Sequence, residues 1–222
     1  MSITDGLLAP AASFWLLAVF SAFVVLALWR LPWRILLGNR QLQHLFFGST
    51  VALTLLWTLR AGISPGLGIH FLGMTLLTLM FGWDLAIISA TLALLGVSWI
   101  GLESWQGFGF NGLCTIVLPA LVSLGVLRLV EARLAKNFFV YLFCCGFLGA
   151  AISVGVMGLA AALSLWGLGV YPWQQVYQEY VLLLPLIMFP EGLLNGIVMT
   201  AMMVFYPDWI RTFNARIYID EQ

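Results

Sequence analysis

The side chains best suited to chemistry in this chain are His70, Glu191 and Asn111, because each lies within or beside a long apolar run. An imidazole is a common ligand for nickel, cobalt, zinc and copper, and a carboxylate or amide oxygen can complete such a site. Two plainer interpretations are also open. His70 would then bond to carbonyl groups of the preceding loop, and Glu191 would be a protonated group bonded between helices.

Glu191 belongs to a polar and sulfur-bearing face of its expected helix. At about 100° per residue, five side chains fall within an arc of roughly 80°. They are Met188, Glu191, Asn195, Met199 and Met202. This face indicates either a cation pathway directed toward His70 or a packing seam in which the methionines fill space. Thioether ligands in such a pathway would favour copper(I).

The elements that carry these residues must lie in a membrane. Hydrophobic residues make up 63% of the chain and charged residues 8%, which is too little polar surface to cover a soluble globule. A single transmembrane domain is expected over residues 1–222, with an external segment at 1–10, a helical bundle at 11–205 and a cytoplasmic tail at 206–222. With a net charge of zero and no long basic stretch, nucleic acid is not an expected partner.

The apolar runs predict an all-α integral membrane fold of seven helices. Their expected ranges are 11–29, 42–60, 70–82, 84–100, 110–132, 138–165 and 178–205. The third and fourth are shorter than the roughly 20 residues of a full span. Joined, they would reach about 46 Å, too long for one crossing. The sequence Phe81-Gly82-Trp83-Asp84 offers a break, so we expect two short helices.

The basic residues predict the orientation of this bundle. Seven crossings place all of them except Arg60 on one side, which should be the cytoplasm of a bacterial inner membrane. They are Arg30, Arg34, Arg40, Arg128, Arg133, Lys136, Arg211 and Arg216. The amino terminus is then outside and the carboxyl terminus inside. The tryptophans, Trp57 included, lie near helix ends and predict aromatic belts at both interfaces.

The other carboxylates and the cysteines are expected to have structural roles only. Four carboxylates near helix ends are expected to be hydrated: Asp84, Glu103, Glu131 and Glu179. Three cysteines are expected to pack inside helices without a disulfide: Cys114, Cys144 and Cys145. Small residues in the sixth helix predict close helix packing: Gly146, Ala150, Gly155 and Gly158.

Four short stretches resemble the CbiM/NikM family, the substrate-binding membrane components of energy-coupling-factor transporters for cobalt and nickel. Met1-Ser-Ile-Thr-Asp-Gly-Leu-Leu8 is similar to the family's Met-His-Ile-Pro-Asp-Gly-Phe-Leu, and Gly66-Leu-Gly-Ile-His-Phe-Leu-Gly73 to its Gly-Thr-Ser-Gly-His-Leu-Leu-Gly. Phe108-Gly-Phe-Asn111 and Pro190-Glu-Gly-Leu-Leu194 match its Gly-Ala-Asn and Gly-Glu-Ala-Leu-Ile stretches. The resemblance spans nearly the whole chain and implies the same seven-helix plan.

The resemblance also implies a metal site. In the family, the terminal amine, the backbone nitrogen and imidazole of a histidine at position two, and a second histidine matching His70 bind a divalent metal. This transfers the ligand roles to Met1, Ser2 and His70, with Asp5, Asn111 and Glu191 as possible supporting residues. Position two is serine here, which removes a strong nitrogen donor and leaves the ion open between cobalt, nickel and copper. Removal of the initiator methionine would move the terminal amine to Ser2.

Three classes of function follow from these observations. The first is a transition-metal uptake permease or substrate-binding component, whose metal is its substrate and which needs no organic cofactor. Its partners would be the lipid bilayer, a coupling transmembrane subunit and cytoplasmic ABC ATPases, because the chain has no Gly-x-x-x-x-Gly-Lys-[Ser/Thr] nucleotide motif. The second is an accessory or assembly subunit with a modified or lost metal site. The third, an intramembrane enzyme using His70 and Glu191, lacks an evident nucleophile, so we expect no enzyme.

Overall fold

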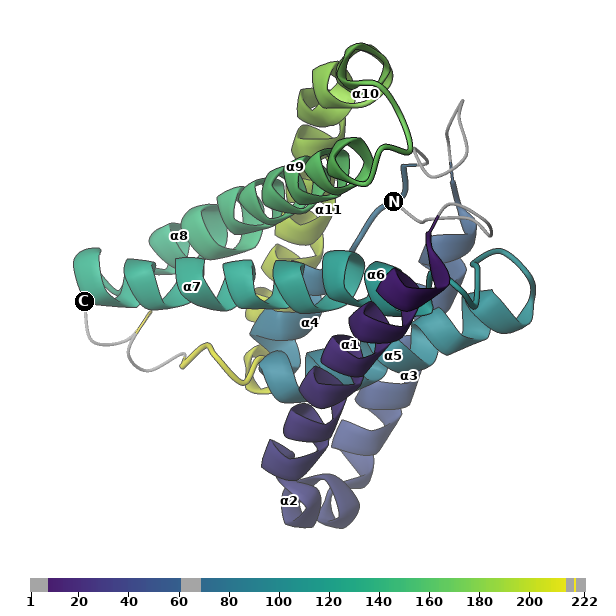
Figure 1. Cartoon of the computed structure of the whole chain (residues 1–222). Helices are drawn as coiled ribbons and strands as arrows, with labels where there is room; N and C mark the ends of the chain where they lie inside the picture. Colours follow the sequence, from purple (N-terminus) through teal and green to yellow (C-terminus); the bar gives the residue numbers. More distant parts are fainter. Residues whose placement is uncertain (1–7, 61–68, 215–217, 219–222) are drawn as a thin grey trace.

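The computed structural model describes residues 8–60, 69–214 and 218, which form helices joined by short connections, with no β-sheet among them. Figure 1 shows the arrangement of the helices in space. They are α1 (Pro10–Arg30), α2 (Trp33–Gly38), α3 (Arg40–Thr58), α4 (Met74–Phe81), α5 (Trp83–Trp99), α6 (Phe108–Gly112), α7 (Leu118–Arg133), α8 (Phe138–Val140), α9 (Gly149–Gly167), α10 (Trp173–Glu179) and α11 (Leu184–Phe205). π-Helical stretches join α6 to α7 and α8 to α9 (Leu113–Val117 and Tyr141–Leu148), and 3-10 turns lie at Val181–Leu183 and Pro207–Trp209.

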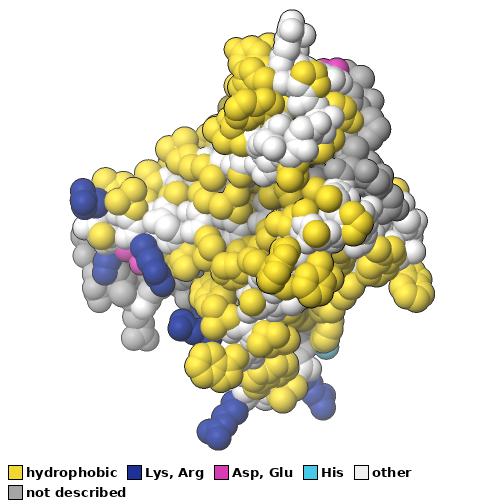
Figure 2. Space-filling view, viewed as in Figure 1, with side chains coloured by type: hydrophobic (Ala, Val, Ile, Leu, Met, Phe, Trp, Pro, Cys, Tyr) yellow, Lys and Arg dark blue, Asp and Glu magenta, His cyan; other side chains and the backbone are white. Residues whose placement is uncertain are grey.

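The described helices have the length and surface of a membrane protein. Four helical segments are long and apolar enough to cross a bilayer: Pro10–Arg30, Phe108–Arg133, Phe138–Gly167 and Trp173–Phe205. Their outward side chains are apolar, as with Phe14 and Leu186, which are 65% and 70% exposed. Hydrophobic side chains cover most of the visible face in Figure 2. Because so much exposed apolar surface is unfavourable in water, the prediction of a membrane protein is confirmed.

Most helices lie where the apolar runs predict them. The helices at 10–30, 40–58, 83–99, 108–133 and 138–167 begin and end within two residues of the expected positions. The expected break between the two short helices is also confirmed, since α4 ends at Phe81 and α5 begins at Trp83. Gly82 between them has φ +83°, a conformation that glycine adopts without the strain a Cβ would cause.

Two expected boundaries are wrong. The third helix begins at Met74 and not at residue 70, because Gly73 turns the chain with φ +65° and residues 69–73 form a non-helical segment. We call residues 69–73 the strap. The last expected helix is interrupted at Tyr180, whose φ of −132° and ψ of −57° separate α10 from the turn that precedes α11. A proline in the first turn of α11 favours a fresh helix start there.

Helix α4 occupies the centre of the bundle. It contacts α5, α7, α9 and α11, and all its residues except Leu76 are buried. The segment after α11 holds the far end of this helix: Arg211 N–H donates to Met80 O at 2.8 Å, and Thr212 Oγ1 donates to Leu79 O at 2.7 Å. These bonds satisfy carbonyl groups that a helix end would otherwise leave unpaired. Part of the expected tail therefore packs on the bundle.

Glycines allow the outer helices to approach closely. A Cβ on Gly109 of α6 would overlap the backbone of Leu17 in α1, and one on Gly158 of α9 would overlap Leu184 of α11. A Cβ on Gly155 would lie 3.0 Å from Met188 Sδ. The expectation of close packing along α9 is confirmed. All three cysteines are free thiols within helices, as expected.

Two carboxylates expected to be hydrated are instead buried in ion pairs, so that prediction is wrong for them. Asp84 is 4% exposed and lies 2.9 Å from the Arg211 guanidinium, while Glu103 is 7% exposed and lies 2.7 Å from that of Arg60. The place of Trp57 in an aromatic belt is also wrong, because this side chain is only 1% exposed. The two ion-pair partners, Arg211 and Arg60, are distant in sequence from Asp84 and Glu103, so hydropathy alone could not reveal these pairs.

Candidate functional site

His70 lies in the strap, outside any helix, where two aromatic and backbone contacts fix its position. Trp57, near the end of α3, packs on the imidazole with ring centroids 5.7 Å apart. The Trp57 indole N–H also donates to Leu72 O at 3.1 Å, which ties the strap to α3. His70 is 6% exposed. The strap therefore presents one buried imidazole, and the backbone that follows it is tied to α3.

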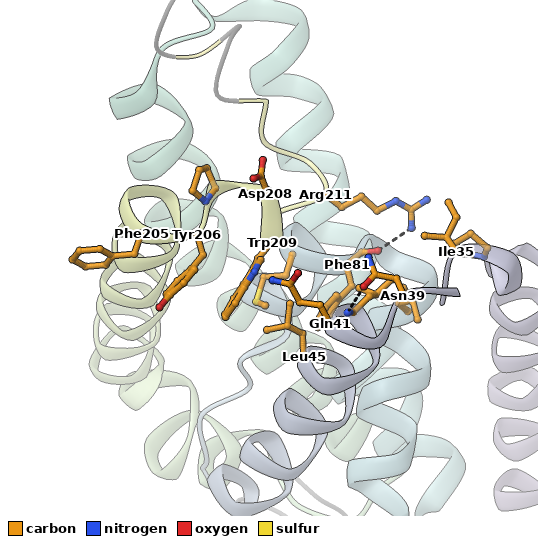
Figure 3. A pocket seen from close by; sticks show the side chains of 15 residues that line it. Ile35, Asn39, Gln41, Leu45, Phe81, Phe205, Tyr206, Asp208, Trp209 and Arg211 are labelled. Carbon is orange, nitrogen blue, oxygen red and sulfur yellow. Dashed lines mark hydrogen bonds between the residues drawn. The ribbon is translucent and has the colours of Figure 1, made fainter. Parts of the chain in front are cut away.

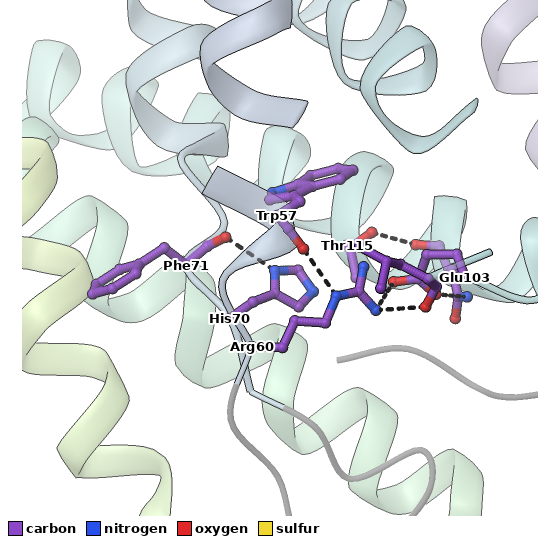
Figure 4. Close-up of polar contacts among 8 residues, drawn as sticks. Trp57, Arg60, His70, Phe71, Glu103 and Thr115 are labelled. Atoms are coloured by element: carbon purple, nitrogen blue, oxygen red, sulfur yellow. Dashed lines mark hydrogen bonds and ion pairs between the residues drawn. The ribbon is translucent and has the colours of Figure 1, made fainter. Parts of the chain in front are cut away.

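The hydrogen bonding of His70 determines which ring nitrogen is available. Its Nδ1 lies 3.0 Å from the carbonyl oxygen of Phe71, as Figure 4 shows. A carbonyl can only accept, so Nδ1 carries the proton and Nε2 presents its lone pair. Burial lowers the pKa of this imidazole well below its ordinary value, and the charge of Arg60 adds to that shift. A neutral imidazole with a free Nε2 lone pair is the form that binds transition metals.

Glu191 and Asn195 hold the strap from the side of α11. The Leu72 N–H donates to Glu191 Oε2 at 2.9 Å, and the Gly73 N–H donates to Glu191 Oε1 at 2.8 Å. The Asn195 amide donates to Glu191 Oε1 at 2.9 Å, and its oxygen accepts from Leu76 N–H at 2.9 Å. Together the two side chains cap the beginning of α4, where a helix leaves N–H groups unpaired. Of the five residues on the predicted face of this helix, Glu191, Asn195 and Met199 are buried, and Met188 and Met202 are partly buried.

Asn111 belongs to a second network on the other side of the strap. Its amide donates to Glu103 Oε2 at 2.7 Å, and Thr115 donates to its backbone oxygen at 2.6 Å. Glu103 Oε1 pairs with Arg60 at 2.7 Å, and Arg60 Nε donates to Trp57 O at 2.9 Å. Figure 4 shows this series of contacts beside His70. Asn111 is thus linked to the Trp57 backbone through two ionised side chains.

The structure brings the three described candidates to one region without joining them around a common centre. Glu191 bonds to the strap two residues beyond His70, whereas Asn111 is linked through Glu103 and Arg60 to Trp57, which packs on His70. In the described part of the chain, no three His, Cys, Asp or Glu side chains form a metal-binding group. Met1, Ser2 and Asp5 lie outside the described residues. Their proposed part in the site stays a prediction.

Sequence reasoning missed the residues that support the site. The sequence pattern assigns Trp57, Arg60 and Glu103 to the interface or to water, yet Trp57 packs on His70, Arg60 bonds to Trp57, and Glu103 pairs with Arg60. One signal was available: Arg60 is the only basic residue that the charge pattern left on the outer side. An isolated arginine at the end of an apolar helix often has a carboxylate partner, because burying an unpaired charge is costly.

Two cavities flank the ends of α4. One of about 380 Å³ lies beside the strap and is lined by His70, Arg60, Phe71 and Pro190, among others. The other, of about 590 Å³, lies at the opposite end of α4 and is shown in Figure 3. The polar side chains that line it include Asn39, Gln41 and Arg211. The first cavity gives the imidazole side of the strap room for a small ligand.

The sequence of this chain is similar to that of a known protein family. The family model described as "Cobalt uptake substrate-specific transmembrane region", CbiM, matches residues 2–209. No curated protein sequence matches the chain.

Solved structures show the same fold. A crystal structure of a truncated transition metal transporter superposes with a TM-score of 0.76 at 19% identity, covering 92% of this chain and 99% of that one. A second crystal structure of a transition metal transporter gives 0.69 at 19% identity, covering 92% and 93%. At this identity the likeness shows the fold, while the sequence model shows the family. From residue 2 to residue 209, this chain belongs to the CbiM family of substrate-specific transmembrane proteins.

Proposed function

We propose that this chain is the substrate-binding membrane component of a transition-metal uptake system, with cobalt or nickel as its substrate. The observation that carries the proposal is the buried, neutral imidazole of His70, whose Nδ1 proton leaves Nε2 free beside a cavity. Family membership supports the same role. The amino-terminal donors expected from the resemblance, Met1 and Ser2, would complete the coordination of the ion.

One described contact, made by the first described residue, supports this part of the proposal. Gln106 Nε2 donates to Leu8 O at 2.9 Å, and Leu8 is buried. Gln106 lies between Glu103 and Asn111 of the second network. Leu8 therefore contacts the segment that also carries Glu103 and Asn111, which supports a site made from both chain segments.

Seven crossings with an external amino terminus are the topology that fits this proposal. Basic side chains lie along the lower and left edges of Figure 2, near α2 and the end of α7, which would face the cytoplasm. Lys136 is the single lysine of the chain. An amine reagent that cannot cross membranes should label Lys136 in inverted membrane vesicles but not in right-side-out ones. Labelling only in right-side-out vesicles would reverse the topology.

The absence of a nucleotide-binding motif implies that energy comes from partners, which we propose are a coupling membrane subunit and cytoplasmic ABC ATPases. Metal accumulation should then require those partners. Accumulation by cells expressing this chain alone would show that it acts as a solitary permease.

Metal analysis of the purified protein tests the substrate. Protein in native lipid is loaded with cobalt or nickel, washed and analysed by elemental methods. We expect His70→Ala to lose the bound metal, and Ser2→His to raise cobalt or nickel affinity by restoring an imidazole and a chelate ring. The matched control is His44→Ala, which alters the only other histidine, an exposed one in α3.

The same measurement separates the alternatives. Wild-type protein without bound metal would favour the accessory subunit with a lost site, which the serine at position two motivates. Selective retention of copper(I) would favour a copper-handling permease. Metal that persists in His70→Ala would exclude the proposed site.

A further inference from the structure

A single peptide group lies between Glu191 and the imidazole of His70. Its carbonyl, that of Phe71, accepts from His70 Nδ1 at 3.0 Å. Its N–H, that of Leu72, donates to Glu191 Oε2 at 2.9 Å. Both groups belong to one planar, conjugated unit. The carboxylate and the imidazole are therefore joined by two hydrogen bonds through one peptide.

This chain of bonds is buried. Glu191 and Leu72 are each 1% exposed, and His70 is 6% exposed. The other carboxylate oxygen is fixed by the Gly73 N–H and the Asn195 amide at 2.8 and 2.9 Å, so Oε2 has a set direction. In such an environment hydrogen bonds in series polarise one another, and a negative charge on one end strengthens the rest.

Metal-binding histidines in proteins usually donate their other ring N–H to a carboxylate or a carbonyl, which fixes the tautomer and strengthens the donor nitrogen. Here the acceptor is a carbonyl whose own peptide is bonded to a carboxylate. We propose that Glu191 is a positioning residue that acts on His70 through the Phe71–Leu72 peptide, holding the proton on Nδ1 and strengthening Nε2 as a ligand. The inference rests on the proposed function, in which His70 binds the metal.

The tautomer of His70 tests the relay without any metal. The chain has two histidines, so ¹⁵N-histidine labelling in a His44→Gln background gives signals from His70 alone. We expect the Nδ1–H tautomer in that background. After Glu191→Gln we expect a mixture of tautomers, because the new NH2 group would face one of the two strap N–H groups and the Phe71 carbonyl would no longer be held against Nδ1. An Nε2–H tautomer before the second substitution, or an unchanged tautomer after it, would overturn the proposal. If Glu191→Gln does not fold, Glu191→Asp replaces it, with the same expected direction.

Cobalt(II) then distinguishes a positioning role from direct ligation. With Glu191→Gln, we expect cobalt to bind about 10- to 100-fold more weakly, with the same visible absorption bands, because the donor atoms are unchanged. A shifted band pattern would show that Glu191 is itself a ligand, and equal affinity would show that it does not act on His70. Either result overturns the relay.

The control removes an equal charge elsewhere. Glu131→Gln, at the exposed end of α7, should bind cobalt like the wild type. Wild-type protein that binds neither cobalt nor nickel would refute the proposed function, whereas the tautomer measurement would still decide the relay.

Discussion

Replacing Arg60 by methionine is expected to destabilise the protein more than neutralising its partner Glu103. Methionine keeps most of the arginine stem but removes the guanidinium. The loss leaves the Glu103 carboxylate, whose side chain is 3% exposed, without the cation 2.7 Å from it. The reverse change, Glu103→Gln, leaves Arg60 with the carbonyl oxygens of Trp57 and Leu102 at 2.9 and 3.0 Å.

The structure sets the magnitude of this effect. Breaking a fully buried pair costs about 3–5 kcal/mol, whereas an exposed pair contributes about 0–1 kcal/mol. The side chain of Arg60 is 19% exposed, which lies nearer the buried limit, and the bond from Asn111 at 2.7 Å still supports Glu103. We therefore expect about 2–3 kcal/mol for Arg60→Met. Glu103→Gln should cost about 1–2 kcal/mol, since a hydrogen-bonded neutral group replaces the charge.

A double-mutant cycle measures the interaction directly. Thermal unfolding in lipid nanodiscs should show Arg60→Met lowering the melting temperature by roughly 4–12 °C, at about 2–4 °C per kcal/mol for a chain of this size. The double variant should be more stable than Arg60→Met, because no unpaired charge remains buried. Additive losses would refute the reasoning, since they would mean that the two side chains contribute independently.

Further substitutions test the helix packing, the strap and the α4–α5 junction separately. Gly109→Ala should lower stability by about 1–3 kcal/mol through overlap with α1. Gly125→Ala, in the same helical segment (Phe108–Arg133) but with open space around it, should be neutral or raise stability by up to about 1 kcal/mol; equal thermal shifts would contradict the close approach of α6 to α1. Trp57→Phe keeps an aromatic ring but loses the bond to the strap, so cobalt affinity should fall severalfold, and the thermal midpoint should fall as well because the smaller ring leaves a cavity; unchanged affinity would mean that the strap needs no such tie. Arg211→Gln should speed amide exchange at the α4–α5 junction, measured by hydrogen–deuterium exchange, because it releases Asp84 and a carbonyl at the end of α4; protection equal to wild type would contradict this.

Hydropathy was a reliable guide to the helices but not to the strap. Apolar runs predicted five helical segments to within two residues, and Gly82 marked the break between the short helices. The start of α4 was misplaced because residues 69–73 are as apolar as a helix. Their conformation depends on Gly73 and on bonds to Glu191, more than 100 positions away in the chain. No periodicity in the local sequence encodes such a contact.

The sequence by itself determined that this is a helical membrane protein and that His70 and Glu191 are the unusual polar groups in it. Composition and apolar periodicity suffice for that, because the bilayer acts on each segment independently. Only the tertiary structure decided what these groups do. It turned Glu191 toward the strap backbone, Asn111 toward Glu103, and Asp84 toward Arg211. A buried polar group must find a partner wherever the fold supplies one, and the identity of that partner is fixed by the packing of distant helices.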